Sequence, residues 1–525
     1  MSYKGDTYRV PLDVGGFTAN PNTNIIPPTS IVGGENINFH DGGKRRRKGT
    51  AKVNATAISG APHLIGGIDF ILIDGTQFQV FATNDGKIYK NFTTTIKTGL
   101  TINQVSNFCV FNNTVYHTNR RDTIQTWDGV AATTSNLTNP AADWGADNQP
   151  RQLLVHGKGN SERLVAIGTP NNPESIYLSA NGSDNFVTGV VKINIKKSTG
   201  DGGIVGGVDF GDNLILFSKN HSYILTDDSL TTSEWGYTQA QWEGGAAHFR
   251  LIVKTPNDVI CMTEDMDIFS ITAADSYGDY KVASIVRPAY IDKWIRDNIY
   301  LTEAASFHMR YDPVRRAILV FLTPNYRDAG ALKRVNVCLP FYIDRPIESA
   351  WGVPLQNTSY SCGYDAVDSF LVRKGVGEYV VYTCGYDGFL WELESGLSDD
   401  GNAFNSGLIL PYITAENPRT NKIWDNLWLT IIPYTDTTLS VRAWIDGRLV
   451  VEEDFFITED GDELLTESGD YLITEIEQLW TASFTSLSEI DLVEEMVNLG
   501  EEGKRIQIET FNNSATADYL LSEVL

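Results

Sequence analysis

Pairs of short apolar strands, each pair separated by a polar turn, recur along most of this chain. In residues 375–393 an apolar run, Tyr379–Thr383, and an aromatic run, Phe389–Leu393, flank a turn that contains Asp387 and Gly388. Alternating β-branched and aromatic residues bounded by Gly and Asp are typical of β-hairpins. The same order of turn, apolar run, polar break and aromatic run occurs in Asp74–Lys90, Asn112–Gly129, Gly211–Leu225 and Pro256–Ile271. The pattern predicts an internal repeat of hairpins.

The spacing of these hairpins predicts a β-propeller. Their aromatic strands begin at Gly86, Thr123, Ser175, His221, Met266 and Gly388. The first five copies lie roughly 40–50 residues apart, which is the length of one propeller blade. The longer gap before the last copy leaves room for one or two more units, of which Val335–Ile343 is one candidate. Because a closed ring hides the edges of short sheets, we expect six to eight blades over residues 51–398.

Two segments depart from this pattern. In Pro288–Asn298, the spacing of Ile291, Trp294 and Ile295 at i, i+3 and i+4 predicts a short surface helix. From residue 399 to residue 525 the apolar runs are longer, which predicts a separate antiparallel β-sandwich. Its expected strands are Ile409–Thr414, Ile423–Ile432, Leu439–Ile445 and Arg505–Phe511. We therefore expect an all-β protein in which a propeller is followed by a sandwich domain.

Charge is distributed unevenly along the 525 residues. The net charge of −25 argues against general nucleic-acid binding, because phosphate contacts require clustered Lys and Arg. Between Arg448 and Lys504 there are 17 Asp and Glu and no Lys or Arg. We interpret residues 452–503 as an acidic insertion that forms a solvated β-arm or a small hairpin. A calcium loop is disfavoured because Leu464 occupies a ligand position, and strands completed by a neighbouring subunit are the other alternative.

Residues 1–50 are expected to form an extended N-terminal arm that ends in a basic turn. Glu35–Phe39 alternates like a short strand, and an Asp-Gly-Gly turn signal follows it. The next five residues are the cations Lys44, Arg45, Arg46, Arg47 and Lys48. By itself, such a run indicates a solvated turn, a localisation signal or a patch for polyanions.

The order of these N-terminal elements resembles the opening of tail hub or nozzle proteins of short-tailed bacteriophages. The shared phrase is an Asn, one alternating strand, Asp-Gly, basic residues and Gly-Thr, and in those families a similar phrase introduces a β-propeller. The inserted helix at Pro288–Asn298 and the long strand that follows Lys422 also resemble parts of these tail proteins. The resemblance covers most of the chain in architecture and rests on short motifs.

The resemblance implies a structural virion protein of the phage tail, assembled in the bacterial host cytoplasm. Its subunits would form a ring, a homohexamer, that links the head–tail adaptor to distal tail parts and forms part of the conduit for genome ejection. DNA should pass such a conduit without specific binding, so we expect acidic side chains to face the channel or a neighbouring subunit. The acidic candidates are Glu459, Asp460, Asp462, Glu463, Glu467 and Asp470. The basic run Lys44–Lys48 would lie at the subunit interface, against acidic surface of a neighbour.

The motifs of enzymes and metal sites are missing from this sequence. We find no nucleophile elbow, no nucleotide phosphate loop, no His-Glu-x-x-His and no Cys-x-x-Cys, so we expect no enzyme activity, no cofactor and no metal. The alternative class is a glycan-binding or glycan-cleaving propeller in receptor recognition, although Ser179–Phe186 matches the sialidase box poorly. No stretch has the roughly 18 apolar residues of a bilayer span, so no membrane insertion is expected. Five scattered cysteines, Cys109, Cys261, Cys338, Cys362 and Cys384, are expected to be buried free thiols.

Overall fold

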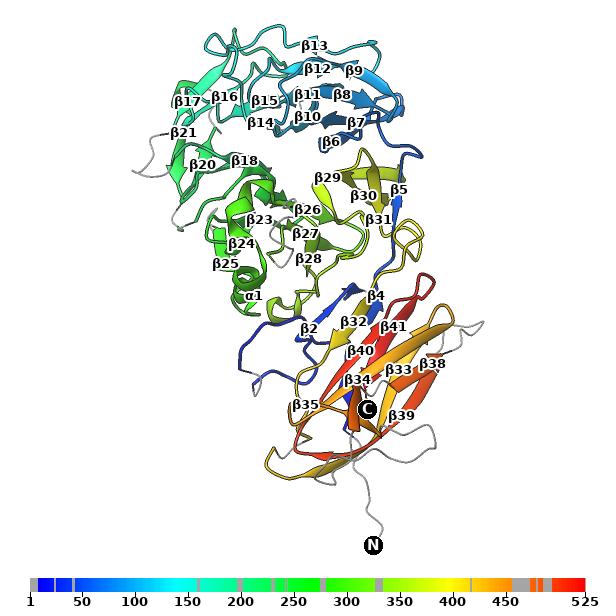
Figure 1. Ribbon diagram of the computed structural model, residues 1–525. Helices are drawn as coiled ribbons and strands as arrows, with labels where there is room; N and C mark the ends of the chain where they lie inside the picture. The colour runs from blue at the N-terminus through cyan, green and yellow to red at the C-terminus, as the bar shows by residue number, and fades with distance from the viewer. Residues whose placement is uncertain are drawn as a thin grey trace. The chain divides into compact units, whose positions relative to one another are not determined.

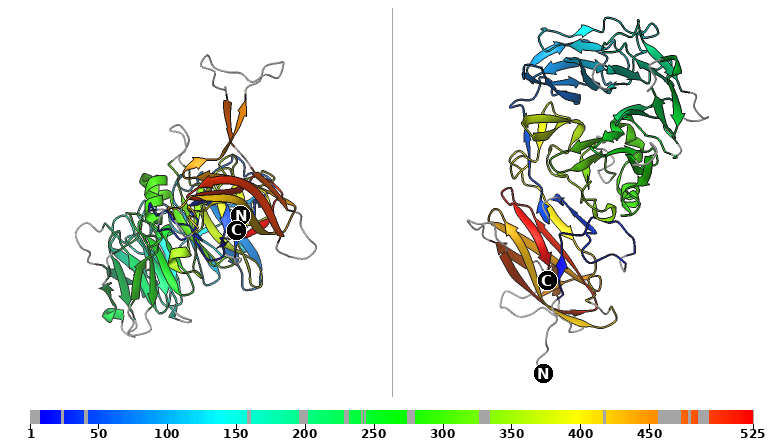
Figure 2. Two further views of the ribbon diagram at one scale, coloured as in Figure 1. Left: turned by 90° about the horizontal axis from the view of Figure 1, so that it is seen from below. Right: turned by 180° about the vertical axis from the view of Figure 1, so that it is seen from behind.

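The computed structural model describes residues 8–22, 25–39, 43–157, 161–195, 202–227, 232–240, 242, 244–273, 280–325, 334–415, 418–455, 473–477, 480–484 and 493–524. The chain forms two compact units, each of which is discontinuous in sequence. Unit 1 comprises Met1–Lys48, Glu348–Leu355 and Leu397–Leu525, and unit 2 comprises Gly49–Ile347 and Gln356–Gly396. Figures 1 and 2 show both units as almost entirely β-structure.

Unit 2 is a propeller of seven blades in its described residues, and each blade is one antiparallel sheet (Figure 1). Blade 1 contains β6 (Leu64–Ile71), β7 (Gln77–Thr83), β8 (Lys87–Lys90) and β9 (Thr94–Lys97). Blade 2 contains β10 (Asn107–Phe111), β11 (Thr114–Thr118), β12 (Gln125–Trp127) and β13 (Ser135–Asn136). Blade 3 contains β14 (Gln152–His156), β15 (Arg163–Ile167), β16 (Ser175–Leu178) and β17 (Val191–Asn194). Blade 4 contains β18 (Gly206–Phe210), β19 (Asn213–Phe217), β20 (Ser222–Thr226) and β21 (Gly236–Gln239).

The second half of the propeller is less regular. Blade 5 contains β22 (Ile252–Lys254), β23 (Asp258–Met262), β24 (Ile268–Ala273) and β25 (Tyr280–Ser284). Blade 6 contains β26 (His308–Asp312), β27 (Ala317–Leu322) and β28 (Val337–Tyr342), and blade 7 contains β29 (Ala366–Gly375), β30 (Glu378–Gly385), β31 (Leu390–Leu393) and β5 (Thr50–Lys52). The predicted helix is confirmed as α1 (Ile291–Asn298), which buries Ile291 and Ile295. Short 3-10 helices are η2 (Thr232–Glu234), η3 (Phe249–Leu251), η4 (Leu301–Ser306) and η5 (Ile347–Ser349).

The ring closes between the two ends of unit 2. The first strands of consecutive blades contact one another in the cyclic order β6, β10, β14, β18, β22, β26, β29 and back to β6. In blade 7, β5 from the start of the unit pairs with β31 near its end, with Thr50 opposite Leu393 and Lys52 opposite Trp391. The hairpin at residues 375–393 is therefore the site of closure, and the seven blades fall within the predicted six to eight.

Apolar side chains fill the spaces between neighbouring blades. Between blades 7 and 1, Phe81 and Tyr89 pack with Phe370 and Tyr382, and the two rings of Phe81 and Tyr89 are stacked. Between blades 1 and 2, Trp127 makes edge contacts with Phe70 and Phe78. Aromatic contacts of this kind add to the stabilisation from apolar burial. The aromatic strands of the repeat thus hold one blade against the next.

Unit 1 contains two six-stranded antiparallel sheets within its described residues, and both draw strands from the two ends of the chain. The first sheet has the order β3 (Ile37–Asn38), β4 (Lys44–Arg46), β41 (Tyr519–Val524), β33 (Lys422–Pro433) and β39 (Val493–Gly503), with β1 (Val10–Pro11) also paired to β41. The second has the order β2 (Gly33–Glu35), β32 (Ser406–Ile409), β40 (Ile506–Asn512), β34 (Thr437–Ile445) and β35 (Arg448–Leu449), with β38 (Trp480–Phe484) also paired to β34. Leu439, Val441, Ala443 and Ile445 of β34 alternate as buried residues, as in a sheet with one face in a core. That the two sheets pack as a sandwich stays a prediction.

Two expectations about unit 1 need correction. Residues 33–46 contribute β2, β3 and β4 to its sheets, so this part of the predicted N-terminal arm is built into the unit. The acidic stretch 452–503 is not one insertion, because β38 and β39 belong to the two sheets. Among the described residues of this stretch, β36 (Val451–Phe455) and β37 (Ile473–Glu477) form a separate two-stranded ribbon, which stands away from the sheets in the left view of Figure 2.

Candidate functional site in the propeller channel

The predicted basic turn is a strand whose charged groups are used inside unit 1. β4 pairs with β3 on one side and with β41 on the other. The side chains of Lys44, Arg46 and Arg47 are 0%, 1% and 1% exposed, while Lys48 is exposed. A solvated turn is therefore wrong, and so is a subunit-interface role for these three buried side chains. For the partly buried Arg45 and for Lys48 that role stays a prediction.

Arg47 forms a buried ion pair with Asp399. Its two terminal nitrogens lie 2.9 and 2.7 Å from the Asp399 carboxylate oxygens, and both side chains are fully buried. Arg47 Nε donates to Asn36 Oδ1 at 2.7 Å, and the guanidinium lies 3.6 Å from the centre of the Phe404 ring. Bidentate pairs of this kind are strong and fix geometry. The pair therefore joins the two stretches of unit 1 that border the propeller in sequence.

The neighbouring cations are also held within the chain. Arg46 donates to the carbonyls of Leu397, Ser514 and Ala517 at 3.0, 2.6 and 2.7 Å. Burial lowers the pKa of Arg46 to about 10, so the group stays charged at neutral pH. Arg45 makes a bidentate pair with Asp518 at 3.1 and 2.8 Å.

Lys44 completes the set of buried cations in this strand. Its ammonium donates to the carbonyl of Gly15 and lies 3.9 Å from the centre of the Phe39 ring. Together, the contacts of Lys44, Arg45, Arg46 and Arg47 hold segments of unit 1 together.

The acidic candidates lie outside the described residues. Glu459, Asp460, Asp462, Glu463, Glu467 and Asp470 all fall between β36 and β37. The backbone pairing of Val451 with Glu477 and of Phe455 with Ile473 defines the start of the predicted β-arm. Their expected place at a channel or between subunits stays a prediction.

A cavity of about 480 Å³ lies at the centre of the propeller, and the structure points to it as the candidate site. It is lined by the first strands of six blades, namely β6, β10, β14, β22, β26 and β29, together with η3. This volume is within the range of small-molecule sites in proteins. Because every blade directs its first strand at the axis, residues far apart in sequence meet there.

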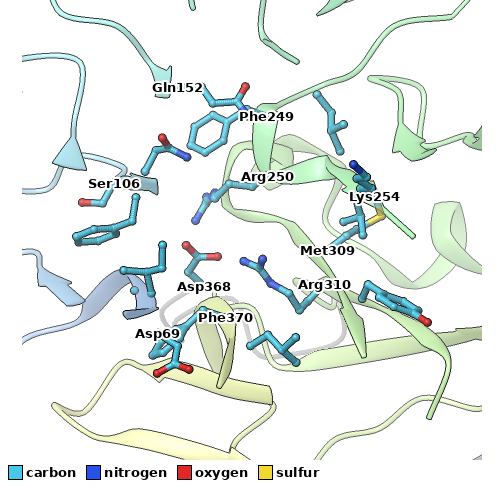
Figure 3. A pocket seen from close by; sticks show the side chains of 18 residues that line it. Asp69, Ser106, Gln152, Phe249, Arg250, Lys254, Met309, Arg310, Asp368 and Phe370 are labelled. Atoms are coloured by element: carbon cyan, nitrogen blue, oxygen red, sulfur yellow. The ribbon is translucent and has the colours of Figure 1, made fainter. Parts of the chain in front are cut away.

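Three charged side chains converge on this cavity from three blades (Figure 3). Arg250 comes from η3 before blade 5, Arg310 from β26 of blade 6, and Asp368 from β29 of blade 7. Arg250 and Asp368 are 9% and 8% exposed. Burial raises the pKa of Asp368, although the positive charges of Arg250 and Arg310 act in the opposite direction.

The two arginines also stabilise the propeller through backbone carbonyls. Arg250 donates to the carbonyl of Val367 at 3.0 Å and to that of Ala305 at 2.7 Å, and Arg310 donates to the carbonyl of Ser369. Arg250 thus joins blade 5 to blade 7 and to the segment before blade 6. The Nε atoms of both arginines are buried without a hydrogen-bond partner among the described residues.

Buried histidines near the channel are held neutral. Burial lowers the pKa of His117 to about 4. Burial, with the charges of Arg250 and Arg310 nearby, holds the pKa of His308 well below its usual value. His117 contacts Ser106 Oγ at 3.0 Å, and His308 stacks on Phe321. These histidines therefore add no charge to that of Arg250, Arg310 and Asp368.

The remaining sequence-based expectations concern the cysteines, metal sites and membrane spans. All five cysteines are free and buried, which confirms that prediction. Within the described ranges, no group of three or more His, Cys, Asp or Glu is placed to hold a metal ion. The helices that the structure describes include none long and apolar enough to cross a bilayer.

Sequence reasoning missed Arg250, Arg310 and Asp368. No motif joins them, because they belong to three blades and are brought together only by ring closure. Their position in the repeat could have indicated them, since each residue precedes or lies on the first strand of its blade.

Comparisons with known proteins find only distant structural likenesses. No protein-family profile and no curated protein matches the chain. Among solved structures, YCF48 from Cyanidioschyzon merolae is similar, with 12% identity and a TM-score of 0.38, covering 66% of this chain and 98% of that chain. The β-propeller domain of Swd1 from Myceliophteria thermophila has 9% identity and a TM-score of 0.40, covering 64% and 98%. BBS1N, solved in complex with ARL6DN, has 12% identity and a TM-score of 0.41, covering 66% and 95%. Likenesses with TM-scores this low carry no argument, and both the propeller and its blade count rest on the sheets of this chain.

Proposed function

We propose that the chain is a structural subunit of a bacteriophage tail, in a hub or nozzle ring that forms part of the conduit for genome ejection. The observation that carries this proposal is the role of the N-terminal phrase. Its strand and basic residues become β3 and β4 of unit 1, and its Gly-Thr leads into β5, which pairs with β31 in the propeller. The tail proteins that the sequence resembles use a similar phrase to introduce a propeller.

The build of the two units is consistent with a scaffold. The propeller is inserted between strands of unit 1, and Arg47 and Asp399 lie just outside its two ends in sequence. Segments from the beginning and from the end of the chain therefore belong to the same unit, unit 1. We infer a role without catalysis, in the virion tail, with the head–tail adaptor and distal tail proteins as partners.

In this proposal the acidic residues of the chain keep DNA from binding to the wall of the conduit. The segment between Arg448 and Lys504 contributes −17 to the net charge of −25. Acidic surface repels the phosphates of passing DNA, so the genome would move without specific binding. Assembly of six subunits in a ring, in the host cytoplasm, is what the resemblance adds.

Native mass spectrometry of the full chain, together with a reducing-sugar assay on host surface polysaccharide, tests this proposal. A stable ring without sugar release supports the tail hub. A monomer or trimer that releases reducing sugar from the polysaccharide would instead establish the glycan-cleaving propeller.

A further inference from the structure

The centre of the propeller holds more positive than negative charge in its interior. Arg250, Arg310 and Asp368 point into the same cavity (Figure 3). The other two charged residues of the lining have partners elsewhere, because Lys254 is paired with Asp209 at 3.4 Å and Asp69 accepts from the Gln77 side chain at 2.8 Å. Two guanidinium groups therefore face one carboxylate.

The three central charges do not neutralise one another by direct contact. Among the described residues, no ion pair joins Asp368 to either arginine, and Asp368 Oδ1 accepts instead from the backbone N–H of Ser369 at 2.8 Å. The Nε–H groups of Arg250 and Arg310 are buried without acceptors. The other contacts of these guanidinium groups are with neutral backbone carbonyls, so a further anion would offset the cost of burying their charge.

We propose that this cavity binds a small molecule that carries a single oxyanion, a carboxylate or a phosphate ester, held between Arg250 and Arg310. The planar guanidinium fork matches both of these groups. The volume of about 480 Å³ admits a small ligand and leaves space beyond the oxyanion. The carboxylate of Asp368 disfavours densely charged ligands such as polyphosphates, so one oxyanion is preferred.

This inference is independent of the tail assignment. It rests on the channel of a single propeller, and it holds whether or not the chain assembles into a ring.

Isothermal titration calorimetry on the full chain tests the proposal, with inorganic phosphate and acetate as probes at constant ionic strength. We expect saturable binding of at least one probe. Binding of phosphate alone identifies a phosphate ester as the ligand class, and binding of acetate alone identifies a carboxylate. Pyrophosphate should bind more weakly than the preferred probe. Absence of saturable binding by both phosphate and acetate would overturn the proposal.

Two variants distinguish binding in the cavity from attraction of anions to positive charge elsewhere on the protein. Arg310→Gln removes one arm of the clamp and should weaken binding about tenfold or more. The matched control is Arg373→Gln on the exposed part of the same strand as Asp368, which should leave the affinity unchanged. An equal loss in the two variants would contradict the proposed site.

If Arg310→Gln fails to fold, Asp368→Asn provides a second test of the same site. Removing the one facing carboxylate should tighten binding of the anion about tenfold. Unchanged or weaker binding in folded Asp368→Asn, with folding checked by circular dichroism, would overturn the assignment.

Discussion

The side chains of Arg47 and Asp399 are 0% exposed, so solvent cannot reach them to replace a lost partner. Breaking such a pair leaves one charge buried and uncompensated. We predict that Asp399→Asn lowers the free energy of unfolding by about 3–5 kcal/mol. The measurement is urea-induced unfolding followed by circular dichroism.

The matched control for this prediction is a surface pair. Arg121 and Asp147 lie 3.1 Å apart with side chains 48% and 70% exposed. Arg121→Ala should change stability by no more than about 1 kcal/mol, because exposed ion pairs contribute little. Similar losses in Asp399→Asn and Arg121→Ala would contradict the buried-pair account.

His156 gives a prediction about pH. Its ring lies between the carboxylates of Asp209, at 2.7 Å, and Asp227, at 3.0 Å, so that β14 of blade 3 is tied to blade 4. Burial lowers the pKa of His156, but the hydrogen bonds to Asp209 and Asp227 outweigh burial and raise it to about 9. Because the pKa of His156 is higher in the folded state, its protonation stabilises the folded protein. This stabilisation is complete below the pKa of a histidine in the unfolded chain, about 6.5, and is lost as the pH rises through about 9.

We expect the contribution of His156 to the free energy of unfolding to fall by roughly 3 kcal/mol between pH 6 and pH 10, since one pKa unit corresponds to about 1.4 kcal/mol. His156→Gln should remove that part of the pH dependence of the unfolding free energy. His221→Gln, on the turn between β19 and β20, serves as the control. A wild-type pH profile retained in His156→Gln would show that the ion cluster does not titrate as described.

At the residue scale, sequence reasoning succeeded for apolar groups and failed for charged ones. The five cysteines were placed correctly because free thiols in apolar strands are usually buried. The basic run was misread because its partners, among them Asp399 and Asp518, lie hundreds of residues away. Composition gives no sign of such pairing, so five adjacent cations were expected to be solvated.

At the element scale, the repeat of hairpins corresponds to the second and third strands of each blade. β7 with β8, β11 with β12 and β30 with β31 are examples, and all are short apolar or aromatic strands joined by tight turns. Outermost strands such as β13 and β21 were missed because they carry few apolar residues. The number of blades could not be read from the sequence, because blade 6 lies in an irregular region after α1.

Ring closure through β5 makes a direct prediction. The N–H of Val53 donates to the carbonyl of Leu390 at 2.8 Å just beyond the paired residues of β5. Val53→Pro removes this donor and should lower the free energy of unfolding by about 1–3 kcal/mol. Hydrogen exchange at the backbone of β31 should become faster.

The control is a proline at a turn that accommodates it. Val376 is 91% exposed and precedes Gly377, whose φ is 77°, as at the second central position of a type II turn. Val376→Pro should be neutral or slightly stabilising. Equal destabilisation in Val53→Pro and Val376→Pro would argue against closure by this strand.

At the scale of the whole molecule, the propeller was predicted because closure follows from a repeat of short sheets. Unit 1 was only half predicted, since its sheets combine β1 to β4 with strands that lie more than 350 residues later. Pairing over such separations leaves no local pattern. The channel site shares this origin, because Arg250, Arg310 and Asp368 meet only through the ring.

We propose that copies of this chain assemble into a closed ring around a conduit, and the proposed function depends on this assembly. Negative-stain electron microscopy of the purified full chain tests it most directly. We expect particles with a central pore whose class averages show six-fold symmetry. Isolated particles of the size of a single chain, at concentrations at which the protein is folded, would contradict it.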